Sequence, residues 1–227
     1  MIAAIMQPTY LPWIGYFKLI KSVDKFVFLD DVQFNKRSWQ QRNKIFFNKK
    51  TQYLTVPIKS KGKFLQKISE VMIDESIDWR NDHLKTLELA YKKTTYFDEI
   101  YAILNSVYEK KDQYLSSLNV SLIKTIMNYL NIDKEILFSS ELNTTGHKDE
   151  KLISILKKID ASKYISPEGS KIYIGKGEIF LNNKIDISFF KYVHPIYDQG
   201  HDQKFIKNLS IIDALFNLGK GSLKLID

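Results

Sequence analysis

Short apolar segments alternate with helical stripes at both ends of this chain, and this alternation constrains the fold more than any other feature. Strands that alternate with helices form parallel sheets, because each helix carries the chain back across the sheet. The sequence therefore predicts an α/β fold, namely a mostly parallel open sheet with helices on both faces. The strands predicted for this sheet cover residues 2–6, 25–30, 136–139, 163–166 and 187–190.

The middle of the chain carries only helical patterns. Between residues 78 and 131, apolar residues recur three or four positions apart, as in Leu84, Leu87 and Tyr91. We therefore expect residues 1–227 to form a single α/β domain in which 78–131 are a helical insert or a flanking layer. Shorter patterns predict strands over 52–58 and 68–73, and a helix over 211–218 that a glycine cap at Gly219 ends.

The composition excludes several classes of function. The chain has no cysteine, which excludes disulfide bonds, zinc–thiolate sites and cysteine nucleophiles. No apolar run approaches the ~18–20 residues of a membrane span, and no signal-peptide pattern is present, so we expect a cytoplasmic protein without a membrane span. The net charge of +8 comes almost entirely from lysines that we interpret as scattered. Because nucleic-acid surfaces favour clustered arginine, we expect no nucleic-acid partner, and a homo-oligomer stays open.

Polar and aromatic residues crowd the loop between the first predicted strand and the first helix. They are Gln7, Thr9, Tyr10, Trp13 and Tyr16. Open α/β sheets bind ligands where the carboxyl end of a strand leads into a helix. The N–H groups of a helix N-terminus also favour an anion, often a phosphate. We therefore predict that this loop is the floor of a small-molecule site.

Three further polar clusters follow predicted strands. Because the carboxyl ends of parallel strands share one edge of a sheet, we expect these clusters to line one cleft together with the opening loop. The clusters are Asp30, Asp31 and Gln33, with Arg37, Trp39 and Arg42 behind them; Ser166, Glu168, Gly169, Ser170 and Tyr173; and His194, Tyr197, Asp198, Gln199 and His201.

Each cluster also has a purely structural interpretation. Paired aspartates at a strand end often serve turns, and Arg37 and Arg42 either pair with those aspartates or clamp a diphosphate or carboxylate. Trp13 and Trp39 are either core residues or stacking platforms for a base or sugar. Residues 166–170 form either a turn or a small anion nest.

The histidines are of interest because acid–base chemistry near neutral pH usually uses one. His194 follows a predicted strand and is the preferred general base, whereas His83 lies inside a helical stripe and is discounted. A metal site built from His194 and His201 with Asp198 or Asp202 matches no standard spacing. We therefore assign no metal ligands, and the cofactor stays open.

Several motifs resemble those of the WbqC-like protein family. They are QPTYLPWIGYF at 7–17, DDVQF at 30–34, RN at 42–43, HPIYDQ at 194–199 and LSIIDALFN at 209–217. The resemblance implies a bacterial protein of gene clusters for surface polysaccharides such as O-antigen or capsule. It implies no particular reaction and no catalytic residue.

The start of the chain is also similar in layout to HIGH-type nucleotidyltransferases such as pantothenate synthetase. In those enzymes a Pro-Thr loop precedes a His-x-Gly-His helix start, and the corresponding residues here are Trp13-Ile14-Gly15-Tyr16. Aromatic residues replace both histidines. The similarity implies nucleotide or nucleotide-sugar binding, and the replacement argues against adenylyl transfer.

These observations predict an enzyme of surface-polysaccharide precursor biosynthesis that modifies a nucleotide-activated (amino)sugar by acyl or aminoacyl transfer to its amine. We assign the base to His194 or Asp30 and the oxyanion donors to Gln7 and Tyr10, with the two arginines holding phosphate. The lack of cysteine and of a Gly-x-Ser-x-Gly motif favours direct transfer. The alternatives are a HIGH-like nucleotidyltransferase or nucleotide-binding protein, and a non-catalytic interaction protein of the polysaccharide assembly machinery.

Overall fold

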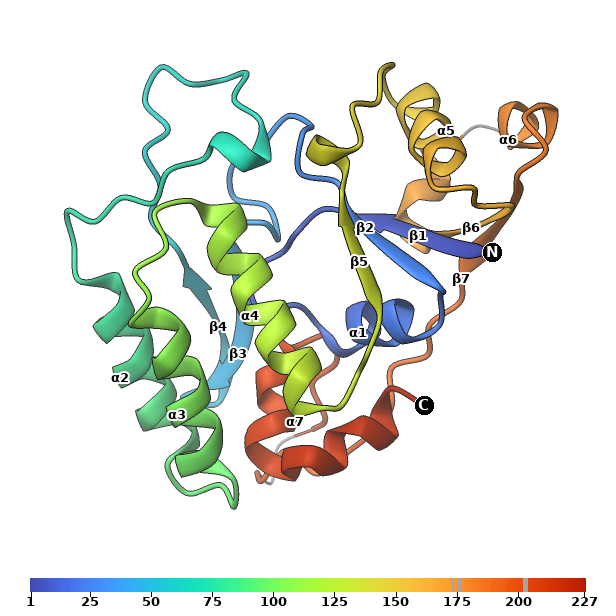
Figure 1. The fold of residues 1–227 in the computed structure, drawn as a ribbon. Coiled ribbons are helices and arrows are strands. Elements are labelled where there is room, and N and C mark those ends of the chain that lie inside the picture. The colour runs from blue at the N-terminus through green and yellow to red at the C-terminus, as the bar shows by residue number, and fades with distance from the viewer. Residues whose placement is uncertain (173, 175–176, 202–203) are drawn as a thin grey trace. The chain divides into compact units, whose positions relative to one another are not determined.

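The computed structural model describes residues 1–172, 174, 177–201 and 204–227 (Figure 1). The chain divides into two compact units of three segments each. The sheet unit comprises Met1–Gln7, Lys18–Asp31 and Asp133–Val193, and the helical unit comprises Pro8–Phe17, Val32–Ile132 and His194–Asp227. Helix α1 (Ile14–Lys21) contributes to both units. Compactness does not measure whether the units unfold together, so the single domain stays a prediction.

Within its described residues, the sheet unit contains a parallel sheet of five strands in the order β5-β2-β1-β6-β7 (Figure 1). This sheet and the helices around it confirm the predicted α/β fold. Each strand lies where the sequence placed an apolar run, with boundaries that differ by a few residues. The strands are β1 (Ile2–Met6), β2 (Lys25–Phe28), β5 (Glu135–Phe138), β6 (Lys163–Pro167) and β7 (Asp186–Phe190).

One apolar cluster holds the sheet unit together. Fully burying one such aliphatic or aromatic side chain stabilises a fold by roughly 1.5–3 kcal/mol. The cluster packs helices α5 (Asp149–Lys158) and α6 (Glu178–Asn182) against the sheet. Helix α5 carries apolar residues three or four positions apart, whereas α6 is too short for a periodic pattern. Members of the cluster include Ala3, Ile5, Val27, Ile153, Leu156 and Phe180.

The order of the strands reverses beside β1. The chain runs from β1 to β2 and then to β5 on one side, and it crosses over to β6 and β7 on the other side. Connections therefore leave the carboxyl ends of β1 and β6 in opposite directions. This is the position at which open α/β sheets bind ligands, because diverging loops leave room at the strand ends.

The helical unit contains the three helices predicted between residues 78 and 131. They are α2 (Trp79–Tyr91), α3 (Phe97–Tyr108) and α4 (Leu115–Tyr129), which lie beside a β-hairpin (Figure 1). The last helix, α7 (Ile211–Leu218), ends at Gly219 with a φ of 55°, as the glycine cap predicted, and the 3-10 helix η4 (Gly219–Leu225) follows.

The hairpin consists of β3 (Arg42–Phe47) and β4 (Lys50–Thr55), which pair with each other in antiparallel fashion. Its two-residue turn, Asn48 and Lys49, has positive φ at both positions, as a type I′ turn requires. Strand β4 overlaps the strand predicted over 52–58. Strand β3 was not predicted, because its polar first half masked the alternation.

The strand predicted over 68–73 is wrong. Residues Ile68–Glu70 form a 3-10 helix, η1, and only isolated bridges involve Met72 and Ile73. The Glu70 carboxylate accepts the N–H of Lys67 at 2.9 Å. This bond joins residues three positions apart and closes a turn, whereas a strand is extended. The other 3-10 helices are η2 (Ser139–Glu141) and η3 (Glu168–Ile172).

Candidate functional site

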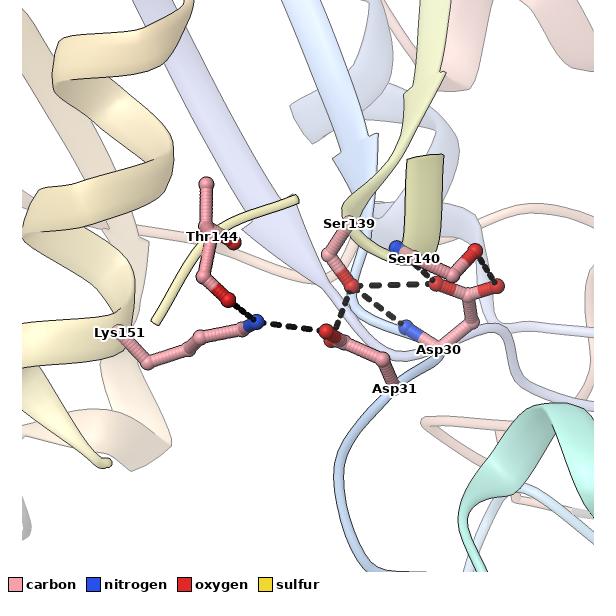
Figure 2. Close-up of polar contacts among 6 residues, drawn as sticks. All are labelled: Asp30, Asp31, Ser139, Ser140, Thr144 and Lys151. Atoms are coloured by element: carbon pink, nitrogen blue, oxygen red, sulfur yellow. Dashed lines mark hydrogen bonds and ion pairs between the residues drawn. The ribbon is translucent and has the colours of Figure 1, made fainter. Parts of the chain in front are cut away.

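The carboxyl ends of β2 and β5 meet in a polar network that Figure 2 shows. Asp30 follows β2, and its carboxylate accepts the N–H of Ser140 at 3.0 Å and the hydroxyl of Ser140 at 2.7 Å. The Asp30 N–H in turn donates to Ser139 Oγ at 3.1 Å. Both carboxylate oxygens of Asp30 are therefore bonded inside the sheet unit. Its predicted role as a base would require Ser140 to release one of them, and that role stays a prediction.

Asp31 pairs with a cation that the sequence did not indicate. Lys151 Nζ of α5 lies 2.6 Å from Asp31 Oδ2 and also donates to the carbonyl of Thr144 at 2.7 Å (Figure 2). Burial alone would raise the pKa of Asp31, but the hydrogen bonds from Lys151 and Ser139 bring it below its ordinary value. Asp31 thus has its charge partner within the sheet unit, and that partner is a lysine rather than an arginine.

Replacing Lys151 by methionine should lower the free energy of unfolding by about 2 kcal/mol, because Asp31 would keep a partly buried charge without its cation. The two side chains are only 10% and 15% exposed, so solvent screens the pair incompletely. Urea unfolding at pH 7 measures the change. The control is Lys157→Met on the exposed face of the same helix. Equal losses in both variants would show that the ion pair contributes nothing.

The end of β6 carries the third predicted cluster at the same edge of the sheet. Ser166 is fully buried, and its Oγ lies 3.2 Å from the hydroxyl oxygen of Tyr164 and 2.5 Å from Ser170 Oγ. Ser170 also donates to the carbonyl of Pro167, whereas Glu168 is exposed and pairs with Lys171. Tyr173 lies outside the described residues.

The carboxyl edge of the sheet therefore brings together the Asp30–Asp31 cluster, the Ser166 cluster and Gln7, the first residue of the opening loop. Gln7 follows β1, which lies between β2 and β6, so its backbone separates the Asp30–Asp31 cluster from the Ser166 cluster. Neighbouring strands lie about 5 Å apart, so the two clusters are roughly 10 Å apart across the edge. That spacing matches one small ligand.

The remaining residues of the opening loop belong to the helical unit, where side-chain amides donate hydrogen bonds to the backbone of the loop. Asn119 donates to the carbonyl of Pro8 at 3.1 Å, and Asn43 donates to that of Leu11 at 2.7 Å. Thr9 is half-buried, and Tyr16 is buried, which raises the pKa of its hydroxyl. The role of these residues as a ligand floor stays a prediction.

Tyr10 takes part in a buried chain of hydrogen bonds. Its hydroxyl lies 2.9 Å from Nδ1 of His83 and is also hydrogen-bonded to the hydroxyl of Tyr108. Burial lowers the pKa of His83 to about 4, so the ring is neutral at pH 7 and has a single N–H, which the carbonyl of Thr55 accepts. His83 Nδ1 therefore accepts from Tyr10, and Tyr10 accepts from Tyr108. Sequence reasoning discounted His83 and missed this chain.

Gly15 has a packing explanation. A Cβ built on Gly15 would lie 2.3 Å from the ring of Trp13, so the half-buried indole covers this glycine. Contact with Trp13 therefore explains why a glycine occupies position 15, within the stretch that corresponds to His-x-Gly-His. A glycine at this position therefore has a packing role, and it is by itself no evidence for nucleotide binding.

The predicted basic residues lie on and near the hairpin of the helical unit. Arg42 stacks on the ring of Tyr53 at 4.4 Å, and the half-exposed Trp39 lies 6.2 Å from the same ring. Arg37 is exposed, and Gln33 donates to the carbonyl of Phe64 at 2.9 Å.

The fourth predicted cluster converges on Asp213, which the sequence did not single out. Tyr197 donates to Asp213 Oδ2 at 2.7 Å, and Gln199 Nε2 lies 3.3 Å from the same oxygen. Tyr91 donates to Oδ1 at 3.0 Å. Burial raises the pKa of Asp213, although these three donors act in the opposite direction.

A cavity of about 630 Å³ borders this carboxyl group. Its lining includes three residues of the predicted fourth cluster, Asp198, Gln199 and His201, together with Phe46 and Asn217. His194 is half-buried and packs on Tyr197 and Phe205, and burial lowers the pKa of its ring. Its Nδ1 lies 2.8 Å from the carbonyl of Pro195.

The described residues include neither a metal-binding cluster nor a membrane-spanning helix. Among them, no group of three or more acidic or histidine side chains is arranged to hold a metal ion. Asp202, part of the predicted metal set, lies outside the described residues. In the described part of the chain, no helix is long and apolar enough to cross a membrane.

The fold and this edge define the class: a doubly wound α/β protein whose polar residues gather at the carboxyl ends of its parallel strands. The sequence profile of the WbqC-like protein family matches residues 7–225, and the chain belongs to this family. It is also 36% identical over 222 residues to the uncharacterized protein Rv1507c of Mycobacterium tuberculosis, covering 95% of this chain and 93% of that protein. No solved structure matches the chain.

Proposed function

We propose that this protein is a cytoplasmic enzyme that binds a nucleotide-activated amino sugar at the carboxyl edge of its parallel sheet. It transfers an acyl or aminoacyl group to the amine of that sugar, as a step in making surface-polysaccharide precursors. The observation that carries the proposal is the reversal of strand order beside β1, with polar side chains after β1, β2 and β6.

The residues at this edge have the chemistry that a sugar nucleotide needs. Hydroxyls of Ser166 and Ser170 and the amide of Gln7 suit sugar and ribose oxygens, which both donate and accept hydrogen bonds. Lys151 supplies positive charge for a diphosphate, because its Nζ lies at the loop that follows β2. A diphosphate bound there would share this lysine with Asp31.

The transfer step is an attack of the sugar amine on the carbonyl carbon of an activated ester or thioester. The C–N bond forms and the bond to the oxygen or sulfur of the donor breaks. The amine loses one proton to a base, which passes it to the leaving alkoxide or thiolate, so that the products are an amide and a free alcohol or thiol. At this edge Asp30 is the candidate base, and Ser140 Oγ must release Asp30 Oδ2 before this oxygen accepts the proton.

Gln7→Ala should fold normally and lose ligand-induced stabilisation. A thermal-shift screen of the wild-type protein with UDP-, GDP- and dTDP-linked sugars identifies the ligand. At 100 times its Kd, that ligand adds about 2.7 kcal/mol, which corresponds to a rise in Tm of roughly 5–10 °C for a chain of this length. In Gln7→Ala most of this rise should disappear.

The matched control is Gln52→Ala, which removes the same side chain from β4 of the helical unit. It should retain the full stabilisation. If Gln7→Ala has the wild-type Tm without ligand and the wild-type rise with ligand, the opening loop does not bind the sugar nucleotide.

A nucleotidyltransferase is the second candidate, since the same strand order suits a nucleoside triphosphate. It would release pyrophosphate from ATP or CTP in the presence of Mg²⁺, which a coupled assay detects. A non-catalytic assembly protein would instead keep its cellular function in the double variant Asp30→Ala, His194→Ala. Either result would replace the acyltransfer proposal.

A further inference from the structure

The positive charge of this protein is concentrated in one segment of the helical unit. Residues 32–69 contain ten lysines and arginines and no aspartate or glutamate. Because the whole chain carries +8, the rest of it carries a small negative charge. The lysines are therefore less scattered than the sequence-wide composition indicated, and this segment is a polycation.

The most basic part of this segment is the loop 59–67, which also presents two large apolar side chains to solvent. Phe64 and Leu65 are adjacent, and each is 83% exposed. Lys59, Lys61 and Lys63 precede them and Lys67 follows, and all four lysines are exposed. Large apolar side chains placed side by side in water usually mark an interaction surface.

The backbone of the segment 32–34 holds this loop in place. The carbonyl of Phe64 accepts the side-chain amide of Gln33 at 2.9 Å, and the carbonyl of Gln66 accepts the N–H of Phe34 at 3.0 Å. On the far side, the N–H of Ile68 donates to the carbonyl of Val32 at 2.9 Å. Phe64 and Leu65 are thus displayed by a fixed loop.

An exposed apolar pair flanked in the sequence by four exposed lysines matches the surface of an anionic bilayer. Aromatic and aliphatic side chains enter the boundary between headgroups and acyl chains, and lysines remain at the phosphates. Each lysine close to such a surface adds attraction that falls off within a Debye length. A single-stranded nucleic acid would use aromatic rings for stacking, and it offers no site for Leu65.

We propose that the loop 59–67 docks this protein on anionic membranes, with Phe64 and Leu65 inserted and the surrounding lysines facing lipid phosphates. This interaction is peripheral and needs no membrane-spanning helix. It is independent of the reaction proposed above, because it uses none of the sheet-edge residues.

Co-sedimentation with unilamellar vesicles tests the proposal. The wild-type chain should bind vesicles of phosphatidylcholine and phosphatidylglycerol in 7:3 ratio at low salt, and should bind vesicles of phosphatidylcholine alone at least tenfold more weakly. The double variant Phe64→Ser, Leu65→Ser should bind the anionic vesicles about tenfold or more weakly than wild type. Its control is Ile77→Ser, Leu89→Ser, which removes exposed apolar side chains elsewhere in the helical unit and should bind normally.

Charge reversal provides an independent variant if the apolar one misfolds. Lys61→Glu, Lys63→Glu should also reduce binding tenfold or more, whereas the equally charged Lys85→Glu, Lys110→Glu, at exposed positions on and after other helices, should reduce it much less. Failure of the wild-type chain to bind anionic vesicles would overturn the proposal. So would wild-type binding by the Phe64, Leu65 variant, or binding of a single-stranded oligonucleotide in place of vesicles.

Discussion

Asp213→Ala should lower the free energy of unfolding by about 4 kcal/mol, the largest loss expected from a single change in this protein. The carboxylate is only 1% exposed and accepts hydrogen bonds from Tyr91, Tyr197 and Gln199. Its removal leaves the buried hydroxyls of Tyr91 and Tyr197 without this acceptor, and each such donor costs roughly 1–3 kcal/mol. Gln199 still donates to the carbonyl of Ile206 at 2.9 Å. Asp213 also lies in the first turn of α7, where a negative charge favours the helix.

Chemical denaturation at pH 7 measures this loss. The matched control is Tyr197→Phe, which removes one donor and leaves the carboxylate with two; it should cost only about 1 kcal/mol. A loss below 1 kcal/mol for Asp213→Ala would mean that the two tyrosine hydroxyls find other acceptors, and that Asp213 is not the structural centre of this cluster.

Acidification should destabilise the protein by about 3 kcal/mol through His83 alone. The pKa of His83 is about 4 in the folded chain, against an ordinary 6.5. Between pH 6.5 and 4, His83 is therefore protonated in the unfolded chain and neutral in the folded chain. The stability that His83 contributes is complete above pH 6.5 and is lost as the pH falls towards 4, at about 1.4 kcal/mol for each pH unit.

His83→Gln separates this contribution from those of other groups. Glutamine keeps a donor for the Thr55 carbonyl and an acceptor for the hydroxyl of Tyr10, but it does not titrate. Between pH 6.5 and 4, the free energy of unfolding should fall about 3 kcal/mol less in this variant than in the wild type. Parallel curves for the two proteins would place the folded pKa of His83 near its ordinary value.

The fold could be predicted to a large extent because its signals are local. The strands β1, β2, β6 and β7 are short apolar runs bounded by polar or turn residues, and α5 has an apolar stripe. The hairpin was half missed, because β3 starts with Arg42, Asn43 and Lys44 and reads as polar. Division of the chain into two units depends on contacts between distant segments, which no local pattern contains.

The candidate site was predicted less completely, because its partners are far apart in the sequence. Lys151 is one of many lysines, and nothing near it shows that it meets Asp31. Asp213 offered a usable signal, since a charged residue inside the apolar run Ile211–Leu218 is either exposed or needs buried donors. His83 offered the same signal, because it is a polar residue within the apolar stripe of α2. It was interpreted as a helix residue without a role, and its hydrogen bond to Tyr10 was therefore not expected.

Chemical-shift mapping of the full chain tests most directly whether the sheet edge binds a sugar nucleotide. The backbone amides of a labelled sample are followed while the best ligand from the thermal-shift screen is titrated in. The largest changes should occur at Gln7, at Asp30 and Asp31, and at residues 139–140 and 166–170, all at or just after the carboxyl ends of strands of the parallel sheet. Changes confined to the cavity beside Asp213, or no changes with any sugar nucleotide, would contradict binding at the sheet edge.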